Sequence, residues 1–231
     1  QQVAPPLHAG WYTRKKSDHF THYNNVANEF AEKLDIDPWL VAPLTLQCGE
    51  VDFMARSGTE CLARNVETML NAVQKKYDQY GIDRRPFAVV KADSGTYGMG
   101  IMTVKSVDEI VNLNRKQRNK MSSAKEGLVV DNVLIQEGVY TFETLGEDLA
   151  VAEPVIYMMD HFVVGGFYRV HTGRSVDENL NAPGMHFQPL AFAQSCIEPN
   201  KADQPDAEPN RFYAYGVIAR LALLAAAREL V

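Results

Sequence analysis

The sequence lacks the features of a membrane-spanning or disulfide-rich protein. It has no uninterrupted apolar run of about eighteen residues, and its most apolar stretch, residues 212–227, contains Arg220. The start at Gln1 also lacks the pattern of a signal peptide. Its three cysteines are odd in number and have no C-x-x-C spacing. They favour free thiols over a disulfide framework or a zinc site, so we expect a protein of the reducing cytoplasm with no membrane partner.

The sequence also lacks an excess of positive charge. Its 23 Lys and Arg residues are outnumbered by 29 Asp and Glu residues, which gives a net charge of −6. Nucleic-acid binding requires a basic field, so nucleic acid is not expected as a partner. No Ser-His-Asp or Cys-His set has a spacing that suits nucleophilic catalysis. The length of 231 residues allows one large domain or two small ones.

What the sequence does contain is a glycine-rich stretch between two apolar runs. The first run ends in Lys91, the second covers residues 101–104, and the glycines between them are Gly95, Gly98 and Gly100. Such glycines let backbone N–H groups converge on one point, which suits phosphate oxygens. The order G-x-x-G-x-G is not a dinucleotide fingerprint, and a Walker A loop would have lysine at Ile101. A strand follows, so we predict a β-hairpin flap; an ordinary glycine-rich hairpin is the alternative.

Periodic apolar positions predict the other elements. Residues 18–34 and 57–80 repeat apolar side chains every three or four positions, as amphipathic helices do, and Gly81 follows the second. The S-x-x-E pattern at residues 106–109 predicts another helix start, and residues 211–230 predict a largely buried closing helix. We expect strands at residues 44–53 and 129–137, and a hairpin at 150–171 that turns at Asp160 and His161.

The order of these elements resembles that of the ATP-grasp ligases. The resemblance implies an α+β (α/β) fold in which nucleotide lies between two α+β lobes, preceded by a partly helical N-terminal segment. Residues 86–231 would form the ATP-grasp-like domain, with a flap lobe at 86–138 and a second lobe at 139–231. Residues 1–85 would form a mostly helical segment that could be a truncated substrate domain.

The resemblance also implies the nucleotide contacts. The flap lysine and the glycine loop would bind the phosphates, the strand joining the lobes would bind adenine, and an acid after it would bind ribose, with Glu147 as a rival for that role. The implied ATP ligands are Lys91, Gly95, Thr96, Gly98, Gly100, Gln136, Glu137, Gly138, Val139 and Glu143.

A magnesium site is implied in the same way. The fold supplies an acid on one strand and an E-x-N element on another, which are hard oxygen ligands for Mg²⁺. Here Glu178 and Asn181 are three residues apart instead of two, so either Asn179 or Asn181 could be the amide ligand. Glu153 is preferred over Asp160 as the first acid because of its strand position. The alternatives are a loop that binds substrate and a simple Asx-rich turn.

Substrate contacts are expected at two places. Arg169, His171 and Arg174 end the second hairpin, where an arginine fork could hold a carboxylate or a phosphoryl group. Lys91 and Arg169 are therefore the predicted catalytic residues. Cys48 and Glu50 flank a glycine and could contact an amino acid, although such a segment is more often an ordinary turn.

Several segments together are similar to a small bacterial family of glutamate–cysteine ligases. The similar segments are residues 36–40, 91–105, 114–121, 136–143, 165–171 and 178–184. The resemblance implies that ATP and Mg²⁺ drive the joining of the glutamate γ-carboxylate to the cysteine amine through an acyl phosphate, the first step of glutathione synthesis. Members of that family are longer than this chain, so a missing N-terminal part is expected.

Two other hypotheses remain open on the sequence alone. One is a different ATP-grasp ligase, either glutathione synthetase-like or peptide-tailoring. The other is a nucleotide-binding module without turnover, which the altered E-x-N spacing keeps possible.

Overall fold

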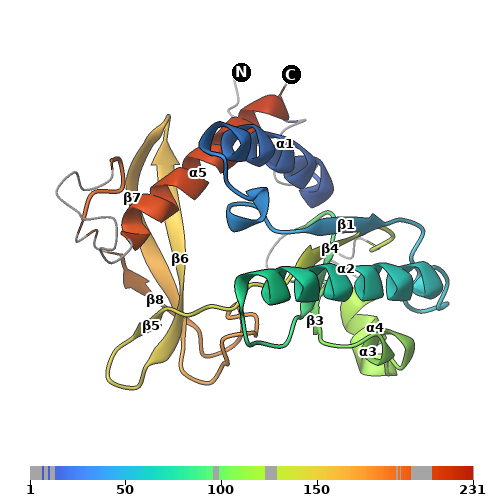
Figure 1. The fold of residues 1–231 in the computed structure, drawn as a ribbon. Helices are drawn as coiled ribbons and strands as arrows, with labels where there is room; N and C mark the ends of the chain where they lie inside the picture. Colours follow the sequence, from blue (N-terminus) through green and yellow to red (C-terminus); the bar gives the residue numbers. More distant parts are fainter. Residues whose placement is uncertain are drawn as a thin grey trace.

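The computed structural model describes residues 7, 10, 14–95, 99–122, 129–190, 192, 194–198 and 210–230. In these residues the strands form two antiparallel sheets of four strands each, accompanied by helices (Figure 1). The strand orders are β1-β4-β2-β3 and β5-β6-β7-β8. The predicted α+β fold with two lobes is therefore confirmed.

The first sheet contains β1 (Thr45–Cys48), β2 (Ala88–Ala92), β3 (Ile101–Val104) and β4 (Val133–Glu137). Along β2, Ala88, Val90 and Ala92 are buried, whereas Val89 and Lys91 are only partly covered. Side chains alternate between the two faces of a strand, so one face of this sheet enters the core and the other carries Lys91. The predicted hairpin is confirmed, because β2 and β3 pair antiparallel.

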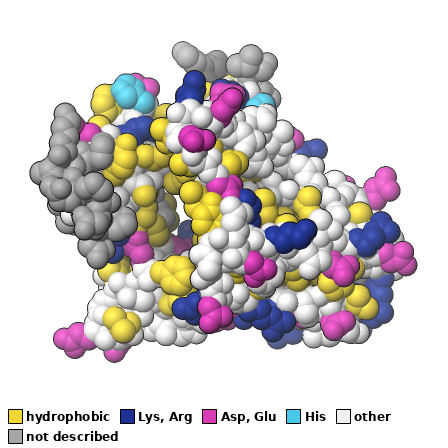
Figure 2. Space-filling model, in the orientation of Figure 1, with side chains coloured by type: hydrophobic (Ala, Val, Ile, Leu, Met, Phe, Trp, Pro, Cys, Tyr) yellow, Lys and Arg dark blue, Asp and Glu magenta, His cyan; other side chains and the backbone are white. Residues whose placement is uncertain are grey.

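The helix α2 (Thr59–Tyr80) covers the buried face of this sheet (Figure 1). Its outer face carries interspersed acidic and basic side chains (Figure 2), and it ends at Gly81, whose φ of 65° suits a glycine cap. One further helix was predicted from residue 106, but the structure has two short helices there, α3 (Asp108–Val111) and α4 (Arg115–Ser122). The side chains of Asn114 and Gln117 each accept a hydrogen bond from the other residue's N–H at 2.9 Å, which starts α4 separately.

The second sheet contains β5 (Thr144–Leu145), β6 (Ala150–Met159), β7 (Phe162–His171) and β8 (His186–Pro189). The strands β6 and β7 form the predicted hairpin and turn at Asp160, whose φ is 52°. The loop between β7 and β8 returns toward the first sheet, and it carries the predicted metal-binding segment.

Two long helices pack against one another beside the sheets: α1 (Lys16–Leu34) and α5 (Arg211–Arg228). The prediction that α5 is largely buried is wrong, since Leu224 is 54% exposed and Ile218 39%. Only a stripe along α5 is covered, by the second sheet at one end and by α1 at the other (Figure 1). A short 3-10 helix, η2 (Pro38–Leu40), follows α1. Within the described ranges, every helix is too short or too polar to span a lipid bilayer.

The predicted boundary at residue 86 does not separate two packing units. The strand β1 pairs with β4, with Thr45 opposite Gln136, and α2 supplies much of the core beneath β2 and β4. Residues on both sides of the boundary therefore build one lobe. That the first 85 residues belong to a substrate domain stays a prediction.

Candidate active site between the two sheets

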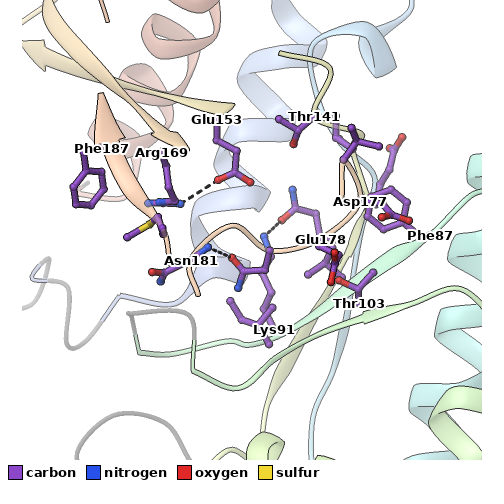
Figure 3. A pocket seen from close by; sticks show the side chains of 18 residues that line it. Phe87, Lys91, Thr103, Thr141, Glu153, Arg169, Asp177, Glu178, Asn181 and Phe187 are labelled. Atoms are coloured by element: carbon purple, nitrogen blue, oxygen red, sulfur yellow. Dashed lines mark hydrogen bonds and ion pairs between the residues drawn. The ribbon is translucent and has the colours of Figure 1, made fainter. Parts of the chain in front are cut away.

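A cavity of about 670 Å³ lies between the two sheets. One wall consists of β2, β3 and β4, and the other of β6, β7, β8 and the loop before β8. Lys91 enters the cavity from the first wall, and the side chains of Glu153 and Arg169 enter it from the second (Figure 3). The lining residues that sequence analysis predicted are Lys91, Gln136, Glu137, Val139, Glu153, Arg169, Glu178, Asn179 and Asn181.

Lys91 is the main cation of the first wall. Its Nζ donates a hydrogen bond to Oε1 of Gln136 on β4 at 2.6 Å, which fixes the side chain across the sheet. Burial lowers the pKa of Lys91 to about 8, and the nearby positive charge of Lys16 acts in the same direction, while Glu153 opposes both. An ammonium held in a partly dry cavity has few competing water contacts, so it can interact strongly with an anion.

Glu153 and Arg169 form an ion pair on the second wall. They lie directly opposite one another on β6 and β7, and Arg169 Nη1 stands 3.2 Å from Glu153 Oε2. Burial raises the pKa of Glu153, and Arg169 limits that rise. The Nε of Arg169 is buried and has no hydrogen-bond partner among the described residues. Arg169 also lines the cavity, and a guanidinium in such a place is suited to hold an oxyanion.

The loop between β7 and β8 is fixed by its own polar side chains. Glu178 accepts hydrogen bonds from Arg174 Nη1 at 2.7 Å and from the N–H of Ser175 at 2.9 Å, and these donors lower its pKa. The N–H of Asn181 donates to Oδ1 of Asn179 at 2.9 Å. These contacts present one carboxylate and two amide side chains to the same cavity.

The donor set of the cavity fits a magnesium ion in kind. Glu153, Glu178, Asn179 and Asn181 all line the cavity and offer carboxylate and amide oxygens, which Mg²⁺ prefers together with phosphate oxygens. Among the described residues no three acidic, histidine or cysteine side chains lie close enough to hold a metal by themselves. A site with few protein ligands that is completed by substrate phosphates is the usual arrangement for this ion.

The segment that joins the lobes, residues 136–139, borders the cavity at one end. The carboxylate of Glu137 is buried and turned toward η2, where it accepts hydrogen bonds from Trp39 Nε1 at 2.8 and 2.9 Å and from the N–H of Leu44 at 3.0 Å. Burial raises the pKa of this carboxyl group. A Cβ at Gly138 would stand 2.1 Å from the ring of Phe87, so glycine is required there. Because the carboxylate of Glu137 is engaged by Trp39 and Leu44, only the backbone of Glu137 is available to contact a nucleotide base.

The turn after Lys91 has the geometry that its glycines suggested. Gly95 has a φ of 82° and Gly100 one of 60°, both in the left-handed region that favours glycine. The N–H of Ala92 donates to the carbonyl of Gly100 at 2.7 Å and closes the base of the hairpin. Neither glycine is among the residues that line the cavity. Thr96 and Gly98, which were also predicted to bind nucleotide, lie outside the described residues.

Two predicted substrate residues have structural roles in the loop. His171 is 8% exposed; its Nδ1 accepts a hydrogen bond from the N–H of Gly173, and its Nε2 donates to the carbonyl of Pro183. Arg174 pairs with Glu178 and is not among the cavity-lining residues. Both residues therefore shape the loop that carries Glu178 and Asn181 without lining the cavity themselves.

Three further predicted residues lie elsewhere. Glu143, the predicted ribose ligand, faces Arg211 of α5 at 3.9 Å. Cys48 is buried with its Sγ 3.1 Å from Cys61 Sγ, and burial raises the pKa of its thiol to about 12. Glu50 borders a separate depression beside Val130 and Asp131. None of the three lines the cavity between the sheets.

Some residues that line the cavity were not predicted from the sequence. Thr103 lies on β3 next to Val89 in register, and Asp177 precedes Glu178 in the loop. The carboxylate of Asp177 forms an ion pair with Lys105, which follows β3, so it ties the loop of the second lobe to the first lobe. The alternation of β3 could have revealed Thr103. No local pattern shows that Lys105 and Asp177 meet, because they come from different lobes.

Two α+β lobes with a cavity between them, a lysine on one wall and an acid–arginine pair on the other, define an ATP-grasp-like protein. The family model GshA, glutamate-cysteine ligase, matches residues 1–230. The chain belongs to this glutamate-cysteine ligase family.

The structural comparison agrees with this assignment. The crystal structure of a protein of Methylobacillus flagellatus KT, provisionally named gamma-glutamylcysteine synthetase, is similar to this chain with a TM-score of 0.86 and 66% sequence identity. The match covers 100% of this chain and 54% of that one, so the chain spans about half the length of that protein. A comparison with curated proteins gave no significant match.

Proposed function

We propose that this chain carries the nucleotide site of an enzyme that joins the γ-carboxylate of glutamate to the amine of cysteine, using ATP and Mg²⁺. The observation that carries the proposal is the cavity in which Lys91 faces the Glu153–Arg169 pair. Membership of the glutamate-cysteine ligase family supplies the two amino acids. The reaction would form γ-glutamylcysteine, the first step of glutathione synthesis. The free thiols of the described cysteines support a cytoplasmic location.

The proposed reaction has two transfers and needs no protein nucleophile. A carboxylate oxygen of glutamate attacks the γ-phosphorus of ATP, the bond to the bridging oxygen breaks, and ADP leaves. The amine nitrogen of cysteine then attacks the carbonyl carbon of the acyl phosphate, inorganic phosphate leaves, and the amine loses a proton to solvent. Catalysis then rests on positioning and on stabilising negative charge.

The residues of the cavity have matching roles in this proposal. Lys91 binds the phosphates, and Arg169 holds either the transferred phosphoryl group or the substrate carboxylate through its guanidinium. The backbone of residues 137–139 contacts adenine at the junction of the lobes. Glu153, Glu178 and an amide from Asn179 or Asn181 would hold Mg²⁺, which neutralises phosphate charge when bound.

Phosphate release by the full-length protein tests the proposal. Purified protein is incubated with ATP, with or without Mg²⁺, and with each amino acid alone and in pairs. We expect release only with Mg²⁺, glutamate and cysteine together, and a product with the mass of γ-glutamylcysteine. Release with other pairs would instead indicate another ATP-grasp ligase. ATP binding without release under any condition would indicate a nucleotide-binding module.

A further inference from the structure

The ammonium of Lys16 is surrounded by backbone carbonyls of the turn that follows Lys91. Its Nζ lies 2.7 Å from the carbonyl oxygen of Ala92, 3.2 Å from that of Asp93, 3.3 Å from that of Ser94 and 2.9 Å from that of Gly95. Four consecutive peptide groups thus converge on one cation. Carbonyl oxygens surround a desolvated monovalent cation in the same way in ion-binding sites of proteins.

A second set of contacts locks the start of α1 to the same turn. Asp93 Oδ1 accepts a hydrogen bond from the N–H of Ser17 at 2.8 Å, and Asp93 Oδ2 accepts one from the Ser17 hydroxyl at 2.7 Å. The N–H of Lys16 donates to the carbonyl of Asp93 at 2.9 Å. Asp93 is 7% exposed and Ser17 4%. Lys15 occupies the N-cap position of α1, but its side chain makes no capping hydrogen bond. Asp93 therefore supplies the cap from another part of the chain.

This turn follows a residue that lines the cavity, while residues 92–95 themselves do not line it. It starts directly after Lys91, and it leads into Gly95 at the left-handed φ of 82°. In a planar peptide group the carbonyl and the following N–H point in opposite directions. Holding the carbonyls of Asp93 and Ser94 toward Lys16 therefore turns the N–H groups of Ser94 and Gly95 the other way. Within the described residues neither N–H donates a hydrogen bond, so both remain available to an anion.

We infer that Lys16 is a positioning residue for nucleotide binding, whose ammonium acts as a built-in monovalent cation that fixes the turn 92–95 behind Lys91. The inference rests on the proposed function, because it assumes that the turn borders bound ATP. Without the ammonium, the four carbonyl oxygens would lose the donor that they share, and the turn would change its conformation. The N–H groups of Ser94 and Gly95 and the side chain of Lys91 would then lose their alignment.

ATP binding by variants of the full-length protein tests the inference. In Lys16→Met the side chain keeps its length and loses its charge, and we expect ATP to bind about tenfold more weakly, the size of effect that losing one charge-assisted contact produces. The matched control is Lys15→Met, which removes an exposed lysine one residue away and is expected to bind ATP as the wild type does. Binding is measured by titration calorimetry with ATP and Mg²⁺ at constant ionic strength.

Cation rescue separates a cationic role from a packing role. In Lys16→Ala, 100 mM ammonium or potassium chloride, about the ionic strength of cellular fluids, is expected to restore ATP affinity at least threefold, relative to the same concentration of choline chloride. Wild type should show no such difference. If Lys16→Ala does not fold, Lys16→Arg replaces it and should bind ATP more tightly than Lys16→Met does.

The ATP affinities of these variants decide whether Lys16 has the inferred role. It is overturned if Lys16→Met binds ATP within threefold of wild type, if neither ammonium nor potassium improves Lys16→Ala, or if arginine and methionine at this position are equivalent. The readout does not depend on which amino acids are joined. A wild-type protein that binds no ATP would overturn the proposed function and this inference together, whereas normal ATP binding by Lys16→Met overturns this inference alone.

Discussion

Lys91 loses its proton more easily than an exposed lysine, because burial and the charge of Lys16 together lower its pKa to about 8. The protonated form is the one that attracts phosphate. Below pH 8 the unliganded protein already carries this charge, and above pH 8 it loses it. ATP affinity is therefore expected to be flat from pH 6.5 to 7.5 and to fall as pH rises further, by at most about tenfold per pH unit.

The arginine variant is the control for this pH dependence. A guanidinium stays protonated throughout this range, so Lys91→Arg should bind ATP with an affinity that changes little up to pH 9.5. Lys91→Gln should bind weakly at every pH. Titration calorimetry at five pH values measures the three proteins. A wild-type affinity that does not fall between pH 7.5 and 9.5, or an equal fall in Lys91→Arg, would contradict the assignment of the titration to Lys91.

Arg169 is expected to contribute to the reaction rate rather than to folding. Its Nε is free and its Nη1 contacts Glu153, with both side chains about one third exposed. Arg169→Met should lower kcat/KM about a hundredfold, as loss of a donor to a developing charge does. Its effect on unfolding should be about 1 kcal/mol or less, because the ion pair is partly screened by solvent.

Two comparisons make the Arg169 prediction specific. Arg115→Met removes an exposed arginine on α4 and should leave kcat/KM unchanged. Arg169→Lys keeps the charge without the planar fork, so it should lie between wild type and Arg169→Met. The measurements are steady-state kinetics with ATP varied and thermal unfolding of each variant. Activity of Arg169→Met within threefold of wild type would show that the guanidinium does not contact the reacting groups.

At the residue scale, the direction of a side chain could be predicted from the sequence where the residue lies on a strand. Lys91, Glu153 and Arg169 each stand on a predicted strand, and the structure brings all three to one cavity. The ion pair of Glu143 with Arg211 could not be predicted in this way, because Arg211 comes from a helix near the other end of the chain. Cys48 has the alternation of a core residue, which is where the structure places it. A cysteine next to a glycine in the sequence does not show whether its thiol contacts a substrate or packs in the core.

At the scale of elements, the junction of the lobes depends on one glycine. A Cβ at residue 138 would stand 2.1 Å from Cδ2 of Phe87, and the N–H of Gly138 donates to the carbonyl of Phe87 at 2.8 Å. Gly138→Ala must therefore displace a buried ring that also lines the cavity. We expect it to lower the free energy of unfolding by about 1–3 kcal/mol, the usual cost of overpacking.

A second glycine provides the control for this prediction. A Cβ at Gly173 would meet His171 at 3.4 Å, an ordinary contact, so Gly173→Ala should have a small effect on stability. In Phe87→Leu/Gly138→Ala the smaller side chain leaves room for the added methyl group, and the two changes should be less costly together than their sum. Urea unfolding of the four variants measures these differences. A fully additive double variant would show that Phe87 is not the source of the restriction.

Helices and strands were predicted from the sequence where the periodic pattern extends over many residues. They were missed where the element has only a few residues. The two hairpins and the helices α1 and α2 were found, because each repeats a pattern over many residues. The strands β5 and β8 have two and four residues and were not predicted. The break between α3 and α4 comes from the side chains of Asn114 and Gln117, which accept each other's backbone N–H groups.

At the scale of the whole molecule, the cavity depends on contacts between distant parts of the chain that no local pattern encodes. The strand β1 pairs with β4, which lies nearly ninety positions later in the sequence. The first part of the chain therefore belongs to the first lobe. The N–H of Thr141 donates to the carbonyl of Val176 at 2.8 Å, and Lys105 pairs with Asp177. The family resemblance anticipated two lobes, but the loop contacts that set their spacing depend on individual side chains.

The ion pair between Lys105 and Asp177 is expected to hold the loop of the second lobe in place for substrate. Asp177→Asn and Lys105→Met should each raise the KM for ATP several-fold, because Glu178 and Asn181 follow directly in that loop. The double variant should be no worse than either single one, with a coupling energy of about 0.5–1 kcal/mol for a partly exposed pair. Kinetics and unfolding of the four proteins complete the cycle.

The pH and salt dependence of this coupling distinguish an ion pair from a change of shape. Lys105 lowers the pKa of Asp177, and Asp177 raises the pKa of Lys105. The carboxylate's contribution is present above the usual aspartate range of about 4 and is lost below it, and the ammonium's contribution is lost only above about 10. The coupling should therefore be constant from pH 6 to 8.5 and should shrink at 1 M salt, where the screening length is about 3 Å. A coupling that persists unchanged at 1 M salt would mean that packing of the two side chains, and not their charge, joins the lobes at this point.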